Sequence, residues 1–257
     1  MAITEIEYLL FRNLRQQGVL KTDADILELG EANWYGDVGL NNLTGDIARF
    51  APEADREALT RELDEIVAAR RPHFLFELAK VYWRAFLQPR SMTAIDFHGT
   101  DAALKLNLND PLDLGRQFDV VMNLGTTEHV FNVAQAFKTI HDHVRPGGLM
   151  IHGLPFTGWV DHGFYSFHPT FYWDLAAAND YQVVLAVCSE LKPVKLVRVQ
   201  AREEVLKMAE AGQIGVNALM YVVLRAPTVA APFRIPMQGY YARSVSGEAA
   251  KAWTGLR

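Results

Sequence analysis

Histidines in polar or aromatic surroundings are the residues of this chain best suited to proton transfer. A histidine with an unperturbed pKa of about 6.5 can take a proton from a hydroxyl near neutral pH. His129 follows Glu128 directly. His162 stands between Asp161 and Gly163. We therefore predict that His129 and His162 act as catalytic bases, the alternative being that each is a hydrogen-bonded packing residue.

Aromatic residues surround a further histidine and suggest a binding pocket. The segment "GFYSFHPTFYW" places rings beside small and polar residues, which fits a pocket for a small molecule better than ordinary core at the start of a helix. His152 follows the apolar core of a predicted strand. The residues predicted to contact a substrate here are His152, Phe164, Tyr165 and His168.

A metal site is not predicted from the sequence. Glu128, His129, His152 and His162 have side chains that bind metals and could converge in the folded chain, but their spacing matches no recognised ligand pattern.

Three other reactive residues are predicted to be structural. Cys188 is the only cysteine and lies in the apolar run "YQVVLAVCSE", which is typical of a buried thiol. His141 and His143 are two residues apart on a predicted helix and therefore lie on different faces.

Alternating strand and helix patterns must position these side chains. The predicted strands are "ADILELG", "MTAIDF", "ALKLNL", "FDVVMNL", "GGLMIHGL", "YQVVLAV" and "ALMYVVLRA". The predicted helices are an N-terminal one that ends before Gly18, then "EADREALTRELDEIVAARR", "HFLFELAKVYWRAFLQP", "TEHVFNVAQAFKTIHDHV" and "PTFYWDLAAAND". Strands that alternate with helices predict a doubly wound α/β fold, with a mostly parallel sheet covered on both faces.

The 257 residues, half of them hydrophobic, are enough for one large domain over residues 1–257. A charged helical segment at 36–71 is predicted to be an insertion that forms a lid, with a surface helix as the alternative. The lid would bring Trp34 and Tyr35 near a ligand. Residues 228–257 show no sustained period and are predicted to be an irregular C-terminal tail.

The ends of two predicted strands carry residues that are placed for ligand binding. Ligands of parallel sheets lie outside the carboxyl ends of the strands. The strand "ADILELG" ends at Gly30, and "AIDFHG" places Asp96 just after the next strand.

Together these segments resemble a known family. "LELGEAN", "AIDFHG", "NLGTTEHVFN" and "RPGG" occur in the order found in class I methyltransferases that depend on S-adenosylmethionine (AdoMet), with Ala32 where a glycine is usual. The resemblance covers about residues 24–225. It implies a seven-stranded Rossmann-like sheet with a helical insertion after the first strand.

The resemblance also implies a cofactor and its contacts. AdoMet would be bound and S-adenosylhomocysteine released. The residues that it implies for cofactor binding are Glu28, Gly30, Glu31, Asp96, Asn109, Asp110, Asn123 and Gly125. It would also set His129 beside the methyl group. In the family that this chain resembles, the acid at the position of Asp96 accepts hydrogen bonds from both ribose hydroxyls, which suits a carboxylate because it only accepts.

The expected function is methyl transfer from AdoMet to an oxygen of a small-molecule or sugar-like acceptor, with a nitrogen as the second choice of acceptor atom. The alternatives are a non-catalytic AdoMet-binding scaffold or accessory subunit, and an NAD-dependent oxidoreductase, against which the missing G-x-G-x-x-G counts.

Charge and hydropathy limit the partners. A net charge of −5 gives no basic surface for nucleic acid. No apolar run has the length of a membrane helix, and the first residues lack a signal-peptide pattern, so we expect a cytoplasmic protein without a membrane partner. The nonperiodic tail leaves room for a homodimer.

Overall fold

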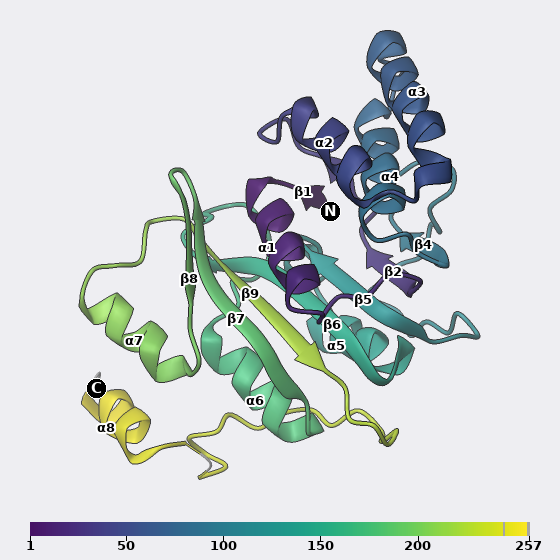
Figure 1. Cartoon of the computed structure of the whole chain (residues 1–257). Helices are drawn as coiled ribbons and strands as arrows, with labels where there is room; N and C mark the ends of the chain where they lie inside the picture. The colour runs from purple at the N-terminus through teal and green to yellow at the C-terminus, as the bar shows by residue number, and fades with distance from the viewer. Residues whose placement is uncertain (244, 256–257) are drawn as a thin grey trace. The chain divides into compact units, whose positions relative to one another are not determined.

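The computed structural model describes residues 1–243 and 245–255, and the chain divides into two compact units. Unit 1 comprises Met1–Asn107 and Phe118–Thr126, and unit 2 comprises Leu108–Gln117 and the chain from Thr127 onward. Figure 1 labels the elements of both units. The single functional domain expected over residues 1–257 stays a prediction.

Unit 1 contains three parallel strands whose carboxyl ends lie in register. The strands are β2 (Asp25–Leu29), β4 (Ser91–Ile95) and β5 (Phe118–Leu124), in the order β4-β2-β5. Leu29 pairs with Ile95 on one side and with Asn123 on the other. The residues that follow β2 and β4, including Gly30 and Asp96, are therefore brought to the same edge.

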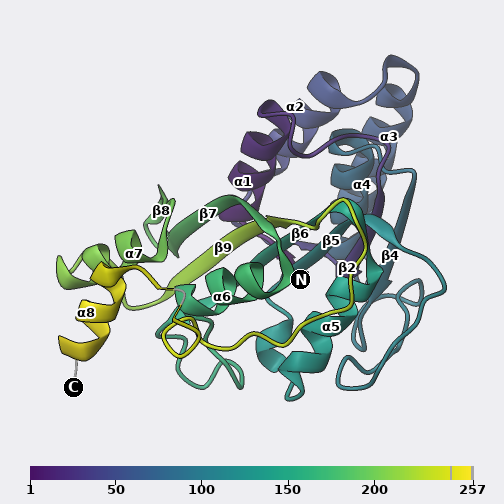
Figure 2. The ribbon, with the colours of Figure 1, turned by 90° about the horizontal axis from the view of Figure 1, so that it is seen from below.

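Helices make up most of the rest of unit 1. They are α1 (Glu5–Gln16), α2 (Leu40–Phe50), α3 (Glu53–Ala69) and α4 (Phe74–Phe86). Figures 1 and 2 show α2, α3 and α4 packed together, with α2 and α3 filling the segment predicted to be a helical insertion. Two short strands, β1 (Ala2–Ile3) and β3 (Asn33–Trp34), pair in parallel beside them. The lid function of the insertion stays a prediction.

Unit 2 contains four antiparallel strands. They are β6 (Val144–Thr157), β7 (Gln182–Leu191), β8 (Val194–Arg198) and β9 (Ala218–Arg225), in the order β6-β9-β7-β8. Both β6 and β7 pair with the buried β9 in antiparallel register. The seven strands make up the mixed sheet of a Rossmann-like α/β fold, which confirms the predicted fold class.

The helices of unit 2 are α5 (Val133–His143), α6 (Pro169–Asn179), α7 (Arg202–Glu210) and α8 (Gly247–Gly255), with a 3-10 turn, η1, at Thr127–His129. In both views α7 and α8 lie side by side (Figures 1 and 2). Lys207 and Glu248 form an ion pair of 3.0 Å between them. The segment 228–257, predicted to be irregular, therefore contains a helix. No helix among the described residues is both long and apolar enough to cross a membrane.

Two predictions about strands are wrong. "ALKLNL" forms no strand, since only Leu104 bridges to Ile95 at the edge of β4. A parallel crossover needs a dozen or more residues, and the eight residues between Ile95 and Leu104 are too few. The "RPGG" turn, predicted to precede a strand, lies within β6, which begins at Val144.

Candidate functional site

The turn after β2 requires a glycine. Gly30 has a φ of +82°, a conformation that favours glycine, and its N–H donates to the Ile95 carbonyl at 2.8 Å. A Cβ at Gly30 would stand 2.6 Å from the Thr126 hydroxyl oxygen and 2.9 Å from the Met1 nitrogen. The atoms that approach Gly30 closely are thus those of Thr126 and Met1 in the same unit, and the contact of Gly30 with a cofactor stays a prediction.

Glu28 holds this turn from inside the unit. Its buried carboxylate accepts a hydrogen bond from the Trp83 indole at 2.9 Å and one from the Ala32 N–H at 3.3 Å. Burial raises the pKa of Glu28 to about 7. Because both oxygens are used, Glu28 fastens the turn to α4, and a contact with a cofactor stays a prediction.

Asp96 joins the ends of β2 and β4. One of its oxygens accepts the Glu31 N–H at 2.9 Å, and the other accepts the His98 N–H at 2.8 Å. A carboxylate has about four lone-pair sites, so two remain for further donors. Asp96 is half-buried. It therefore combines a fixed position with free acceptor capacity.

The carboxylate of Glu31 is committed within unit 1. It forms an ion pair of 2.8 Å with Lys80 and accepts hydrogen bonds from the Thr100 N–H and hydroxyl. Burial alone would raise the pKa of Glu31, but the hydrogen bonds from Lys80 and Thr100 outweigh it and lower that pKa. A contact between Glu31 and a cofactor therefore stays a prediction.

The other predicted cofactor residues belong to both units. In unit 1, Asn123 is fully buried at the end of β5, and Gly125 is exposed with a φ of +67°. In unit 2, Asn109 accepts the Asn132 N–H at 2.8 Å and the Asn132 amide at 3.0 Å. Asn109 therefore holds the residue that caps α5, while Asp110 is exposed.

Unit 2 brings together the two predicted catalytic histidines and Glu128. The Nε2 atoms of His129 and His162 each lie 3.8 Å from Oε1 of Glu128. The Glu128 side chain is wholly buried, whereas the two imidazoles are 46% and 43% exposed. Neither Glu128 oxygen has a hydrogen-bond partner among the described residues.

Burial shifts the pKa values of Glu128 and His129 in this cluster. Burial raises the pKa of Glu128 to about 7. The pKa of His129 is lowered by burial first and then by the charge of His162. Close to neutral pH, both protonated and ionised forms of Glu128 are therefore accessible. This arrangement can accept and release a proton.

A close backbone approach fixes His162 against Glu128. The Phe164 N–H donates to the Glu128 carbonyl at 2.7 Å. A Cβ at Gly163 would stand 2.9 Å from that carbonyl oxygen and 3.1 Å from Nδ1 of His129. Only glycine fits between them without displacement. The Trp159 ring packs against the His162 ring, with the two ring centroids 5.1 Å apart.

Two residues predicted to contact a substrate are core residues. His152 is 1% exposed and packs against Phe137 and Tyr172, and burial lowers its pKa to about 3. Trp34 is 1% exposed in unit 1, where its indole donates to the Val38 carbonyl at 2.9 Å. Both side chains thus lie in the interior, where the large Trp34 ring contributes apolar burial and His152 is held in its neutral form.

The remaining predicted contacts lie at the surface. Tyr35 is exposed in unit 1. In unit 2, Phe164 is exposed and meets Phe131 edge to face at 5.6 Å, while the Tyr165 hydroxyl donates to the Phe131 carbonyl at 2.8 Å. These rings flank the cluster of Glu128 along the chain.

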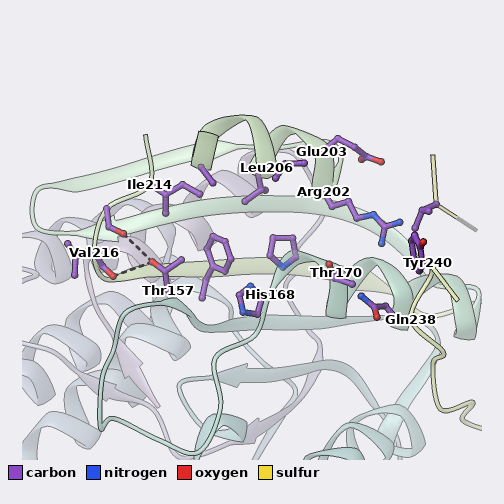
Figure 3. A pocket seen from close by; sticks show the side chains of 16 residues that line it. Thr157, His168, Thr170, Arg202, Glu203, Leu206, Ile214, Val216, Gln238 and Tyr240 are labelled. Carbon is purple, nitrogen blue, oxygen red and sulfur yellow. Dashed lines mark hydrogen bonds between the residues drawn. The ribbon is translucent and has the colours of Figure 1, made fainter. Parts of the chain in front are cut away.

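A cavity of about 700 Å³ opens in unit 2. Figure 3 shows Thr157 and His168 on one side of it and Leu206 and Ile214 from the opposite side. Its lining residues are Phe156, Thr157, His168, Pro169, Thr170, Arg202, Glu203, Val205, Leu206, Ala209, Ile214, Gly215, Val216, Gln238, Tyr240 and Val245. The lining is mostly apolar, and the volume is that of a small-molecule pocket.

The cavity and the histidine cluster share one loop. The segment 157–168 begins and ends in the cavity wall, at Thr157 and His168, and carries His162 between them. Of the residues in this wall, His168 was predicted from the sequence, whereas the face of α7 was not, because "REEVLKMAE" is short and highly charged. Tyr172, a buried tyrosine whose hydroxyl has no partner among the described residues, was not predicted either.

The residues predicted to be structural are confirmed as such. His143 binds the Thr139 carbonyl at 2.7 Å through Nδ1 and accepts the Leu114 N–H at 3.0 Å through Nε2. His141 contacts the Tyr181 hydroxyl at 2.5 Å. Cys188 is buried in β7.

Comparisons with known proteins give similarity at the level of solved structures. No protein-family model and no curated protein sequence matches the chain. The chain is similar to the N-methyltransferase NodS from Bradyrhizobium japonicum, solved with S-adenosyl-L-homocysteine, at 15% identity and a TM-score of 0.44, over 87% of this chain and 89% of that one. It is also similar to the StiE O-MT, at 15% identity and a TM-score of 0.41, over 89% and 75%. A third similar structure is the [4+2]-cyclase SpnF, at 12% identity and a TM-score of 0.40, over 86% of this chain and 81% of that one.

Proposed function

We propose that the protein transfers a methyl group from AdoMet to an oxygen of a small-molecule or sugar-like acceptor, with a nitrogen as the second choice of acceptor atom. The observation that carries this proposal is the joining of the Gly30 turn to Asp96 at one edge of unit 1. The Gly30 N–H binds the Ile95 carbonyl, and the Glu31 N–H binds Asp96 at 2.9 Å. Two separate segments predicted to bind one cofactor thus meet in the same unit.

The residues at this edge fit AdoMet. Asp96 keeps about two lone-pair sites, which is the number that a ribose diol needs. The Gly30 turn is held by Glu28 and Thr126, so its backbone is fixed before any ligand arrives. Bound AdoMet supplies a methyl carbon activated by a sulfonium. The protein mainly has to align an acceptor with that carbon, which can contribute roughly 7–11 kcal/mol.

Proton removal from a hydroxyl acceptor is assigned to His129 and His162. The Nε2 atoms of both histidines lie near a buried carboxylate. Glu128 in its ionised form stabilises a histidine that has gained a proton, because opposite charges attract strongly where water is excluded. General base catalysis of this kind contributes about 10²- to 10⁴-fold.

The acceptor is assigned to the cavity of unit 2. Apolar side chains from α7 and β6 line it, and Thr157, His168 and Gln238 supply polar groups that orient a bound molecule (Figure 3). A small organic acceptor with an apolar body and a hydroxyl fits this lining better than a highly charged one. We propose neither nucleic acid nor a membrane as a partner. A cytoplasmic location and assembly as a homodimer are part of the same proposal.

The test is product formation with histidine variants. The protein is incubated with AdoMet and a panel of apolar alcohols and amines, and S-adenosylhomocysteine and methylated acceptor are measured by mass spectrometry. His129→Ala and His162→Ala should each lower turnover by about 10²-fold or more, with unchanged affinity for S-adenosylhomocysteine. His73→Ala, an exposed histidine in unit 1, is the matched control. Equal turnover in all four proteins would contradict the assigned base, and binding without conversion of any acceptor would favour the scaffold alternative.

A further inference from the structure

The buried carboxylate of Glu128 is not compensated by hydrogen bonds, as buried charges normally are. Its side chain is wholly buried, and neither oxygen has a hydrogen-bond partner among the described residues. Burying an unpaired polar group costs free energy, so such a group in a folded protein calls for an explanation. A positive charge that occupies the space beside Glu128 would provide one.

The groups nearest to Glu128 are metal-binding atoms. Nε2 of His129 and Nε2 of His162 lie 3.8 Å from Oε1 of Glu128, and each of the three side chains offers one ligand atom within 4.8 Å of those of the other two. The two ring centroids are 5.0 Å apart. Because both imidazoles are nearly half exposed, an ion can reach them from solvent.

We propose that Glu128, His129 and His162 form a binding site for a divalent transition-metal ion of the zinc class. Two imidazole nitrogens and one carboxylate oxygen are ligands that zinc accepts, and three protein ligands leave a fourth position open. Metal bonds of about 2.0–2.2 Å at tetrahedral angles separate ligand atoms by about 3.3–3.6 Å. The two 3.8 Å distances therefore need to shorten by only a few tenths of an ångström.

The backbone around the site keeps the three ligands together. The Phe164 N–H binds the Glu128 carbonyl at 2.7 Å, and the His162 N–H binds the Trp159 carbonyl at 3.1 Å. The close approach of Gly163 to His129 leaves no room for a side chain between the loop and the 3-10 turn. The ligands are thus fixed by the fold before an ion binds, which lowers the entropic cost of binding.

This inference goes beyond the proposed methyl transfer and does not depend on it. An ion would occupy the Nε2 lone pairs that the proposed proton transfer uses, so one cluster cannot do both at the same moment. Metal binding is measurable without AdoMet and without an acceptor. Failure of the metal site therefore leaves the methyltransferase proposal standing, and the reverse also holds.

The experiment titrates the full chain, freed of metal by a chelator and dialysis, with Co²⁺ and Zn²⁺. Co²⁺ binding is followed by its visible absorption, and Zn²⁺ binding by calorimetry. We expect one ion per chain. Glu128→Gln and His162→Ala should each weaken binding by at least about 100-fold, more than the loss of an outer-shell partner usually costs.

His168→Ala is the matched control, because His168 lies in the same loop but outside the cluster. It should bind both ions as the unaltered protein does. Glu128→Gln removes a buried ionisable group, so this variant is expected to fold, and circular dichroism checks that it does. Absence of ion binding by the unaltered protein, or ion binding by Glu128→Gln and His162→Ala that is as tight as that of the unaltered protein, would overturn the proposal.

Discussion

Replacing Glu128 by glutamine should stabilise the protein at alkaline pH. The pKa of Glu128 is raised from 4.5 to about 7 by burial, so the folded state holds the proton more tightly than the unfolded state does. The stability that this group contributes is present at low pH and is lost as the pH rises through about 7. Glutamine cannot ionise, so the variant does not suffer this loss.

The size of the effect follows from the pKa shift. One pKa unit corresponds to about 1.4 kcal/mol, so the raised pKa of Glu128 lowers the free energy of unfolding by about 3 kcal/mol at pH 8.5 and by about 1 kcal/mol at pH 5.5, relative to its value well below pH 4.5. The advantage of Glu128→Gln over the unaltered protein should therefore grow by about 2 kcal/mol between these two pH values. Glu28, which titrates in the same range, contributes equally to both proteins and cancels.

The assay is urea unfolding followed by tryptophan fluorescence, in chelator, at both pH values. Glu210→Gln serves as the matched control, since Glu210 is an exposed glutamate in unit 2 and should show no growing advantage. If Glu128→Gln gains nothing over the unaltered protein between pH 5.5 and 8.5, Glu128 has a partner in solution. The roles proposed for Glu128 in proton transfer and in ion binding would then be contradicted.

Three further predictions follow from single contacts. Gly163→Ala should cost about 1–3 kcal/mol of stability and lower turnover, because its Cβ would lie 2.9 Å from the Glu128 carbonyl; normal stability with normal turnover would contradict the close approach. Trp83→Phe should destabilise the fold by about 1–3 kcal/mol in urea unfolding, since it leaves a Glu28 oxygen without its donor; a loss below about 0.5 kcal/mol would show that water replaces the indole. Ala209→Trp should fill the cavity and raise the KM of an acceptor with little change in kcat, whereas Glu210→Trp, outside the lining, should not; equal KM values would place the acceptor elsewhere.

The sequence was sufficient to predict most elements that depend on buried apolar runs. Strands such as β2, β5 and β9 have consecutive buried residues, and their pattern is strong over five to eight positions. The wrong strand at "ALKLNL" has alternating apolar residues too, but Leu104 and its neighbours have no room for a crossover after β4. The short helix α7 was missed because its nine residues are mostly charged and bury only Val205, which leaves too weak a hydrophobic period.

Within the candidate site, features that are local in the sequence were predicted, whereas contacts between distant segments were not. Residue type and position after a strand identified Asp96 and His129, since both features are local. The approach of His162 to Glu128 depends on the loop contact of Phe164, which no spacing in the sequence reveals. Whether a histidine is interior, as His152 is, or at the surface depends on packing against elements such as α5 and α6.

Cofactor binding is tested most directly by calorimetric titration of the purified protein with S-adenosylhomocysteine, with NAD as the parallel ligand. We expect one S-adenosylhomocysteine to bind per chain at micromolar concentrations, and NAD not to bind. Asp96→Ala should abolish that binding, whereas Asp101→Ala, a nearby exposed aspartate, should retain it. Absence of binding by the unaltered protein, or binding of NAD in its place, would contradict the assignment of the Gly30 turn and Asp96 to AdoMet.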